Sequence, residues 1–274
     1  MTPERIPAVL SIAGSDSGGG AGIQADLKAF ARVGVHGMTA ITAITAQNTR
    51  AVEKVELVSP NLVFCQILAI AEDMGADAVK IGMLGSPEII DAVAVGLTYL
   101  GVALAPVVID PVMVAESGAA LTDDETRKAM VEHLLPRCDV ATPNIPEAQV
   151  MTGLGQDASQ DELARGVLEL GPKAVVVTGG HSDEVVDLFY DGQEVIEIPG
   201  ERHPEGAAHG SGCTHSSTLA AYLALGWSPL AAAVGARELT SEAVRDGLRE
   251  IGGGAGPVDV FGFARGRSDA EATR

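Results

Sequence analysis

Apolar and polar positions along this chain fall into blocks that predict strands and helices in turn. Continuous apolar runs rich in β-branched residues are typical of strands buried on both faces of a sheet. Between these runs, apolar residues recur at helical spacing, as do Ile23, Leu27 and Phe30 at i, i+4 and i+7. We therefore expect strands at 8–13, 38–46, 78–84, 106–112, 139–144 and 174–180, and helices at 21–33, 60–74, 87–100, 123–135, 160–171, 214–225 and 229–248.

The alternation of strand and helix predicts an α/β fold, with a mostly parallel central sheet covered by helices on both faces. After residue 180, two short apolar runs are joined by Asp191-Gly192, which is a strong hairpin signal and predicts a small antiparallel pair at one edge. Neither a repeat nor a linker interrupts the chain. We expect a single domain over 1–264 and a polar, disordered tail over 265–274.

Charge and cysteine usage narrow the possible functions. Eighteen Lys and Arg face 37 Asp and Glu, a formal charge of −19, so the surface repels nucleic acid and anionic lipid. Cys65, Cys138 and Cys213 lack the spacing of a zinc site or a disulfide framework. The chain also lacks an apolar run of the roughly 18 residues that a membrane span needs. We expect a soluble, cytoplasmic protein that binds neither nucleic acid nor membrane.

Lysines are scarce, which constrains any anionic ligand. There are five in 274 residues, so we expect such a ligand to be held largely by other groups. The segment 209–217 offers such groups in its backbone. There Gly210, Ser211, Gly212 and Cys213 come directly before a stretch with helical periodicity. The free N–H groups of a helix start bind phosphate or a developing oxyanion without lysine.

Cys213 lies within this segment, and two interpretations of it stay open. The field at the helix start would lower the pKa of its thiol, which suits a base or a nucleophile. Alternatively, Cys213 is a small residue packed beneath a helix.

Other candidate residues follow the strands, because ligands of an open parallel sheet bind at the carboxyl ends of its strands. A glycine-rich turn over 14–22 follows the first strand but fits neither a Walker nor a Rossmann pattern. Asp110, Asn144 and Glu147 follow later strands, and their oxygens could hold Mg²⁺ together with waters.

The same segments carry a family resemblance. The chain resembles the hydroxymethylpyrimidine/phosphomethylpyrimidine kinases of thiamine biosynthesis, in the ribokinase-like superfamily, over about residues 8–262. The motifs that carry the resemblance are AGSDSGGGAGIQADLKAF at 13–30, TAQNT at 45–49, KIGML at 80–84, IDPVMVAESG at 109–118, TPNIPEA at 142–148, GGH at 179–181 and HGSGCT at 209–214.

The resemblance implies a ribokinase-like three-layer sandwich, a homodimer, and transfer of the γ-phosphoryl group of ATP, with Mg²⁺, to 4-amino-5-hydroxymethyl-2-methylpyrimidine and then to its monophosphate. It also implies roles for particular residues. Cys213 would be the base within an anion hole of Gly210, Ser211 and Gly212. The remaining assignments are Gln47, Asp26, Gly14, Met83 and Val112 for the pyrimidine, Asp110, Asn144, Glu147, Thr178 and Gly180 for ATP, and Asp110 and Glu147 for Mg²⁺ through water.

Three positions depart from the family pattern. Lysines of the family motifs are replaced by Glu116, Thr178 and Gly206, which removes positive charge near the phosphates. Three other functions therefore stay open: a pyridoxal kinase-like vitamin kinase, a pyrimidine-binding protein without turnover, and, more weakly, a hydrolase using Cys213 with His209 or His215 nearby. Gln47 in the AQNT motif favours the pyrimidine.

Overall fold

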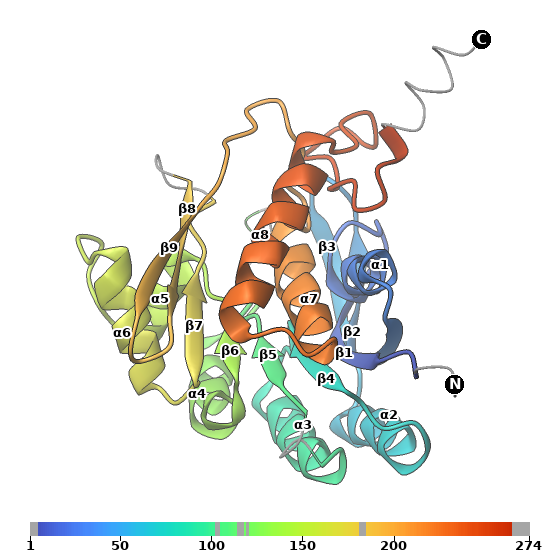
Figure 1. The fold of residues 1–274 in the computed structure, drawn as a ribbon. Helices are drawn as coiled ribbons and strands as arrows, with labels where there is room; N and C mark the ends of the chain where they lie inside the picture. Colours follow the sequence, from blue (N-terminus) through green and yellow to red (C-terminus); the bar gives the residue numbers. More distant parts are fainter. Residues whose placement is uncertain (1–4, 102–104, 114–117, 119–120, 181–184, 265–274) are drawn as a thin grey trace.

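A sheet in the order β3-β2-β1-β4-β5-β6-β7-β8-β9 runs through the centre of the computed structural model, which describes residues 5–101, 105–113, 118, 121–180 and 185–264 (Figure 1). The six strands from β2 to β7 in this order are parallel, as predicted. The strands are β1 (Ala8–Asp16), β2 (His36–Gln47), β3 (Val52–Leu57), β4 (Ala78–Ile81), β5 (Val107–Ile109), β6 (Val140–Ala141), β7 (Ala174–Val177), β8 (Val186–Tyr190) and β9 (Val195–Pro199).

Helices cover both faces of the sheet, which confirms the predicted layers (Figure 1). Successive strand residues point to opposite faces, so Leu10 and Ile12 pack into one core cluster and Val9 into the other. One face carries α1 (Gly22–Val33), α7 (Ser211–Ala224) and α8 (Pro229–Arg245). The other carries α2 (Pro60–Asp73), α3 (Pro87–Tyr99), α4 (Asp124–His133), α5 (Ile145–Thr152) and α6 (Gln160–Glu169), with the short 3₁₀ helix Leu135–Arg137 after α4.

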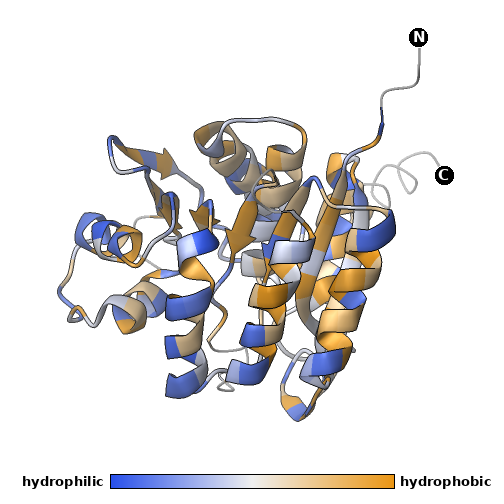
Figure 2. Ribbon diagram, turned by 90° about the horizontal axis from the view of Figure 1, so that it is seen from below, coloured by the Kyte–Doolittle hydropathy of each residue, from blue (hydrophilic) through white to orange (hydrophobic). Residues whose placement is uncertain are grey.

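Hydrophobic residues are concentrated in the sheet between these helix layers (Figure 2). Among the described helices, none combines the length and apolar character needed to cross a bilayer.

The two edges of the sheet differ in how well the sequence predicts them. The hairpin of β8 and β9 is confirmed, and the Asp191 carboxylate accepts the N–H groups of Gln193 and Glu194 in its turn. At the opposite edge, β3 pairs antiparallel with β2 and was not predicted. Its sequence VEKVEL is mostly exposed, so it lacks the continuous apolar run that identifies a buried strand.

Candidate active site

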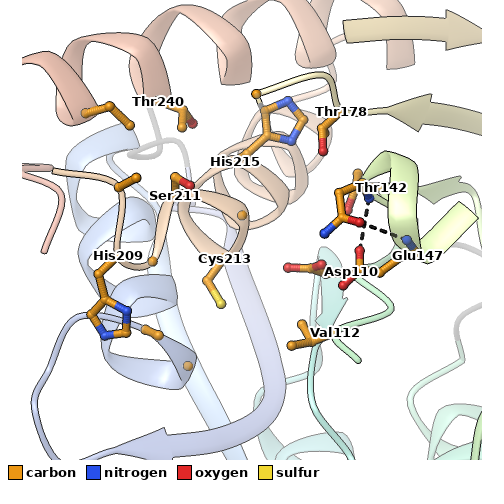
Figure 3. Close-up of a pocket in the computed structure, with 18 of the residues that line it drawn as sticks. Asp110, Val112, Thr142, Glu147, Thr178, His209, Ser211, Cys213, His215 and Thr240 are labelled. Atoms are coloured by element: carbon orange, nitrogen blue, oxygen red, sulfur yellow. Dashed lines mark hydrogen bonds between the residues drawn. The ribbon is translucent and has the colours of Figure 1, made fainter. Parts of the chain in front are cut away.

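A cavity of about 470 Å³ opens at the carboxyl ends of the parallel strands. Its walls come from the glycine-rich turn after β1, from the ends of β2 and β4 to β7, and from the start of α7 (Figure 3). Of the site residues expected from the sequence, the structure brings together Gly14, Gln47, Met83, Asp110, Val112, Asn144, Glu147, Thr178, Gly180, Gly210, Ser211, Gly212 and Cys213.

Asp26 is the exception, and its expected place in the pocket is corrected. Its side chain is fully buried on α1 and does not line the cavity. The Asp26 carboxylate instead lies 3.0 Å from the ammonium of Lys80, also fully buried. Lys80 was missed as a site residue, although a lysine inside the otherwise apolar strand AVKI is a signal that a buried partner exists.

One end of the cavity is lined by Gly14, Met83 and Gln47. A Cβ on Gly14 would lie 2.8 Å from Met83 Cε, so the glycine leaves room for the methionine side chain. Gln47 is half-buried beside them, and its Oε1 accepts a hydrogen bond from the Thr45 hydroxyl at 3.2 Å. The Gln47 amide thus has its nitrogen donors available for a flat polar ligand.

The turn over 14–22 is shaped by Asp16, which the sequence did not single out. The Asp16 carboxylate accepts the N–H groups of Gly18, Gly20 and Ala21 and contacts His209 Nε2 at 3.1 Å. Burial opposes ionisation, yet the His209 contact and the backbone N–H groups together lower the pKa of Asp16.

The start of α7 forms the anion-binding wall. Gly210 precedes the helix with φ of 85°, a backbone conformation that side chains other than glycine rarely adopt. Ser211 N–H donates to the Ala208 carbonyl, whereas the N–H groups of Gly212 and Cys213 have no acceptor in the described part of the chain. These amides face the cavity at the positive end of the helix and suit a phosphate group.

Cys213 does not have the acidic thiol that the sequence led us to expect. Its side chain faces the cavity (Figure 3), and the residue is partly buried. Burial raises the pKa of the Cys213 thiol to about 12, and the Lys80 charge and the Gly22 N–H only partly oppose this. The expected lowering of this pKa by the helix start is therefore wrong.

Two carboxylates meet across the cavity from Cys213 (Figure 3). Burial above all raises the pKa of both Asp110 and Glu147, and the neighbouring Asp110 charge adds to the effect on Glu147. Glu147 is fixed by the backbone N–H groups of Asn144 and Met113. A divalent cation would relieve this repulsion, so the donor set fits Mg²⁺ held by two carboxylates, waters and phosphate oxygens. No cluster of three or more His, Cys, Asp and Glu ligands exists among the described residues.

A second group of missed residues lies at the Thr178 end of the cavity. Asp187 Oδ1 accepts the Gly179 N–H at 2.9 Å and lies 3.5 Å from Arg237 Nη1. His215 Nε2 lies 3.7 Å from Asp187 Oδ2, and burial lowers the pKa of His215. His215 is the signal for this group in the sequence, because it is a large polar residue in a helix of mostly small residues.

Cations are less scarce here than the lysine count suggested. Lys80, Arg202 and Arg237 all line the cavity. Of the three lost family lysines, Glu116 lies outside the described residues. Thr178 lines the cavity, whereas Gly206 packs against α8, where an added Cβ would lie 2.5 Å from the Val244 carbonyl oxygen.

Comparison with known proteins agrees with this geometry. The family model described as phosphomethylpyrimidine kinase matches residues 16–259. A hydroxymethylpyrimidine/phosphomethylpyrimidine kinase of Rhizobium meliloti is 47% identical over 92% of this chain and 96% of its own. A thiamine biosynthesis bifunctional protein of Geobacter sulfurreducens is 42% identical over 92% of this chain and 52% of its own. The pyridoxal kinase of Staphylococcus aureus, solved with AMP-PCP, has a TM-score of 0.86 and 33% identity, with 96% of each chain covered.

Proposed function

This chain belongs to the phosphomethylpyrimidine kinase family, and from that premise we propose that it transfers the γ-phosphoryl group of ATP to 4-amino-5-hydroxymethyl-2-methylpyrimidine and then to its monophosphate. It is thus a phosphotransferase of thiamine biosynthesis. The observation that carries the proposal is that one cavity brings the helix start with its free amides opposite two carboxylates and places Gly14, Met83 and Gln47 at the same site.

The pyrimidine is proposed to bind at the Gly14 end. Gln47 would hydrogen-bond the aminopyrimidine edge, with Met83 and Val112 as apolar walls. Asp26 is buried outside the cavity lining, so we assign it no contact with the pyrimidine. With the ring at one end of the pocket and ATP at the other, the hydroxymethyl group would lie next to the γ-phosphoryl group.

ATP is proposed to lie across the other end, over Asn144, Thr178 and Gly180. Mg²⁺ near Asp110 and Glu147 would neutralise phosphate charge when bound. The N–H groups of Gly212 and Cys213 would stabilise the charge on the transferring phosphoryl oxygens. The backbone N–H groups of Gly212 and Cys213 would supply positive potential where the family lysines are missing.

In the transfer, a bond forms between the hydroxymethyl oxygen and the γ-phosphorus while the bond from that phosphorus to the bridging oxygen of ADP breaks. The free enzyme holds Cys213 as a neutral thiol, because its pKa is raised to about 12. We therefore revise its role from base to a lining group of the anion hole, and the hydroxyl proton passes to an oxygen of the transferred phosphoryl group. A loose transition state needs little removal of that proton beforehand.

One experiment tests the proposal. Purified protein is incubated with Mg-ATP and, separately, with hydroxymethylpyrimidine, its monophosphate or pyridoxal, and the products are identified by mass spectrometry. We expect phosphorylated pyrimidine. Pyridoxal phosphate as the main product would favour the vitamin kinase alternative, which the fold admits but the identities of 47% and 33% disfavour. If the protein binds the pyrimidine but phosphorylates none of the three acceptors, the proposal that it is a kinase is wrong.

We further propose that the enzyme is a homodimer and a single-domain cytoplasmic protein. The β2–β3 ribbon supports a dimer because it exposes Ile44 on one face and Val55 and Leu57 on the other, along an edge strand with unpaired backbone groups. The three cysteines, all free, fit a reducing compartment. Light scattering tests the dimer: Val55→Glu should halve the mass, and a monomeric parent protein would contradict the proposal.

A further inference from the structure

A buried network of charges and hydroxyls lies directly beneath the anion-binding wall. Lys80 on β4 is fully buried, and its ammonium lies 3.0 and 3.2 Å from the two oxygens of Asp26 and 4.0 Å from Asp110 Oδ2. Burial lowers the pKa of Lys80, but the Asp26 carboxylate, with smaller contributions from Cys213 and Asp110, raises it above its ordinary value. The ammonium is therefore a fixed positive charge at the base of the cavity.

Two consecutive serines connect this network to α7. The Ser217 hydroxyl donates to Asp26 Oδ1 at 2.6 Å, and the Ser216 hydroxyl donates to Asp110 Oδ2 at 2.9 Å. Both carboxylates are neighbours of Lys80, so the second turn of α7 is hydrogen-bonded to the two anionic partners of one lysine. The first turn of the same helix carries the free N–H groups of Gly212 and Cys213.

A buried network of this kind contributes more to geometry than to net stability. Charges removed from water lose their hydration, and a well-packed apolar replacement is often as stable. Hydrogen bonds to a charged group are nevertheless short and directional. They determine where α7 lies relative to β4 and to the end of β5, and hence the distance between the anion-binding amides and Asp110.

We propose that Ser217 is a positioning residue for phosphoryl transfer, which holds the start of α7 in register with Asp110 through Asp26 and Lys80. The inference rests on the proposed kinase function. Ser217 does not line the cavity, so it acts through the helix and not by touching substrate.

The chain offers a matched control. Ser11 on β1 donates to the other oxygen of the same carboxylate, Asp26 Oδ2, also at 2.6 Å, and both serines are fully buried. Ser217→Ala and Ser11→Ala therefore each remove one hydroxyl bond to Asp26 at equal depth. The two variants differ in the element that loses its bond to Asp26. In Ser217→Ala this element is α7, which carries the anion-binding amides, and in Ser11→Ala it is β1, which does not carry them.

We expect similar losses of thermal stability from the two variants but different kinetics. Loss of the Ser217 hydroxyl bond to Asp26 should displace the anion-binding amides relative to Asp110 and so weaken their contact with the transition state, which should lower kcat about tenfold in Ser217→Ala. Its KM for the pyrimidine should stay within about twofold, whereas Ser11→Ala should keep both constants within about twofold of the parent. Ser217→Thr, which restores the hydroxyl, should recover most of the kcat. Equal effects of Ser217→Ala and Ser11→Ala on kcat, or a loss of stability alone, would overturn the proposal.

A binding measurement separates this inference from the proposed function. Affinity is measured by calorimetric titration with Mg-ADP and aluminium fluoride. Aluminium fluoride mimics the phosphoryl group in the transition state, so this measurement requires no turnover. We expect Ser217→Ala to weaken this binding about tenfold relative to Ser11→Ala. If the parent protein phosphorylates no acceptor, the proposed function fails while this comparison still decides the role of Ser217. If the parent enzyme is active and the two variants bind Mg-ADP and aluminium fluoride with equal affinity, the proposed role of Ser217 is wrong, while the proposed function stands.

Discussion

His209 Nε2 lies 3.1 Å from Asp16 Oδ2 and joins two glycine-rich segments separated by 193 positions in the chain. The backbones of these segments touch as well, because a Cβ on Gly210 would collide with the carbonyl oxygen of Gly20. The buried Asp16–His209 pair and the close contact of Gly20 with Gly210 thus help to hold the wall proposed for the pyrimidine against the wall proposed for phosphate.

Asp16→Asn should destabilise the protein in a pH-dependent way. The folded state lowers the pKa of Asp16, so its stabilisation is present above the unfolded value near 3.9 and is lost as pH falls through the lower folded value. We expect the variant to be less stable by about 2 kcal/mol at pH 7. Urea unfolding between pH 7 and pH 3 measures the difference, which should shrink below about pH 4. A difference constant with pH would contradict the assigned ionisation.

Cys213→Ser and Cys213→Ala distinguish a lining group from a base. A thiol whose pKa is raised to about 12 is neutral in the free enzyme. We expect Cys213→Ser to retain kcat within about tenfold, since the hydroxyl occupies nearly the same space as the thiol and can donate a hydrogen bond, and Cys213→Ala to lose more. The pH profile of kcat/KM should keep its shape in Cys213→Ser. Loss of an ionisation near neutral pH in that variant would restore Cys213 as the base.

Gln47→Ala should chiefly raise KM for the pyrimidine. Its amide is placed for ground-state contact with the ring edge, away from the reacting phosphate. Loss of a hydrogen bond of about 1 kcal/mol corresponds to roughly fivefold in KM with kcat little changed. Initial-rate kinetics at saturating Mg-ATP measure it, with Gln66→Ala, which bonds the β2 backbone at Ile41 outside the cavity, as a control. A KM within about twofold of the parent would argue against the contact.

Gly206→Lys should not restore a phosphate-binding lysine. The glycine packs against the Val244 carbonyl, where a Cβ would lie 2.5 Å from the oxygen, so any side chain must displace α8 or its own loop. We expect a lower melting temperature and no gain in affinity for ATP. Thr178→Lys is the contrasting variant, because Thr178 lines the cavity. Tighter ATP binding by Gly206→Lys, measured by calorimetry, would show that the loop accommodates the lysine.

Much of the fold could be predicted because it depends on local periodicity. The buried strands appear as apolar runs and the helices as apolar stripes, and the hairpin appears as Asp191-Gly192. The strand β3 escaped prediction because its stability comes from pairing with β2, not from an apolar face of its own.

The candidate site could be predicted in position but not in its electrostatics. The carboxyl ends of parallel strands meet at one edge of the sheet, so the order of strands alone brings Asp110 and Glu147 close together. The thiol of Cys213 could not be assessed in this way, because its pKa depends on burial and on the charges of Asp26 and Lys80, which only the packed structure brings near. Asp26 was misplaced for the same reason.

The contact between Gly20 and Gly210 also has a consequence for biosynthesis on the ribosome. The first glycine-rich turn leaves the exit tunnel before α7 has been made, so a nascent chain does not hold both walls of the proposed phosphate site until α7 has emerged. Domains fold as units during synthesis, and here the element that completes the site follows every strand of the sheet, from β1 to β9, in the chain. Chains truncated before α7 are therefore unable to consume ATP, however well their sheet has formed.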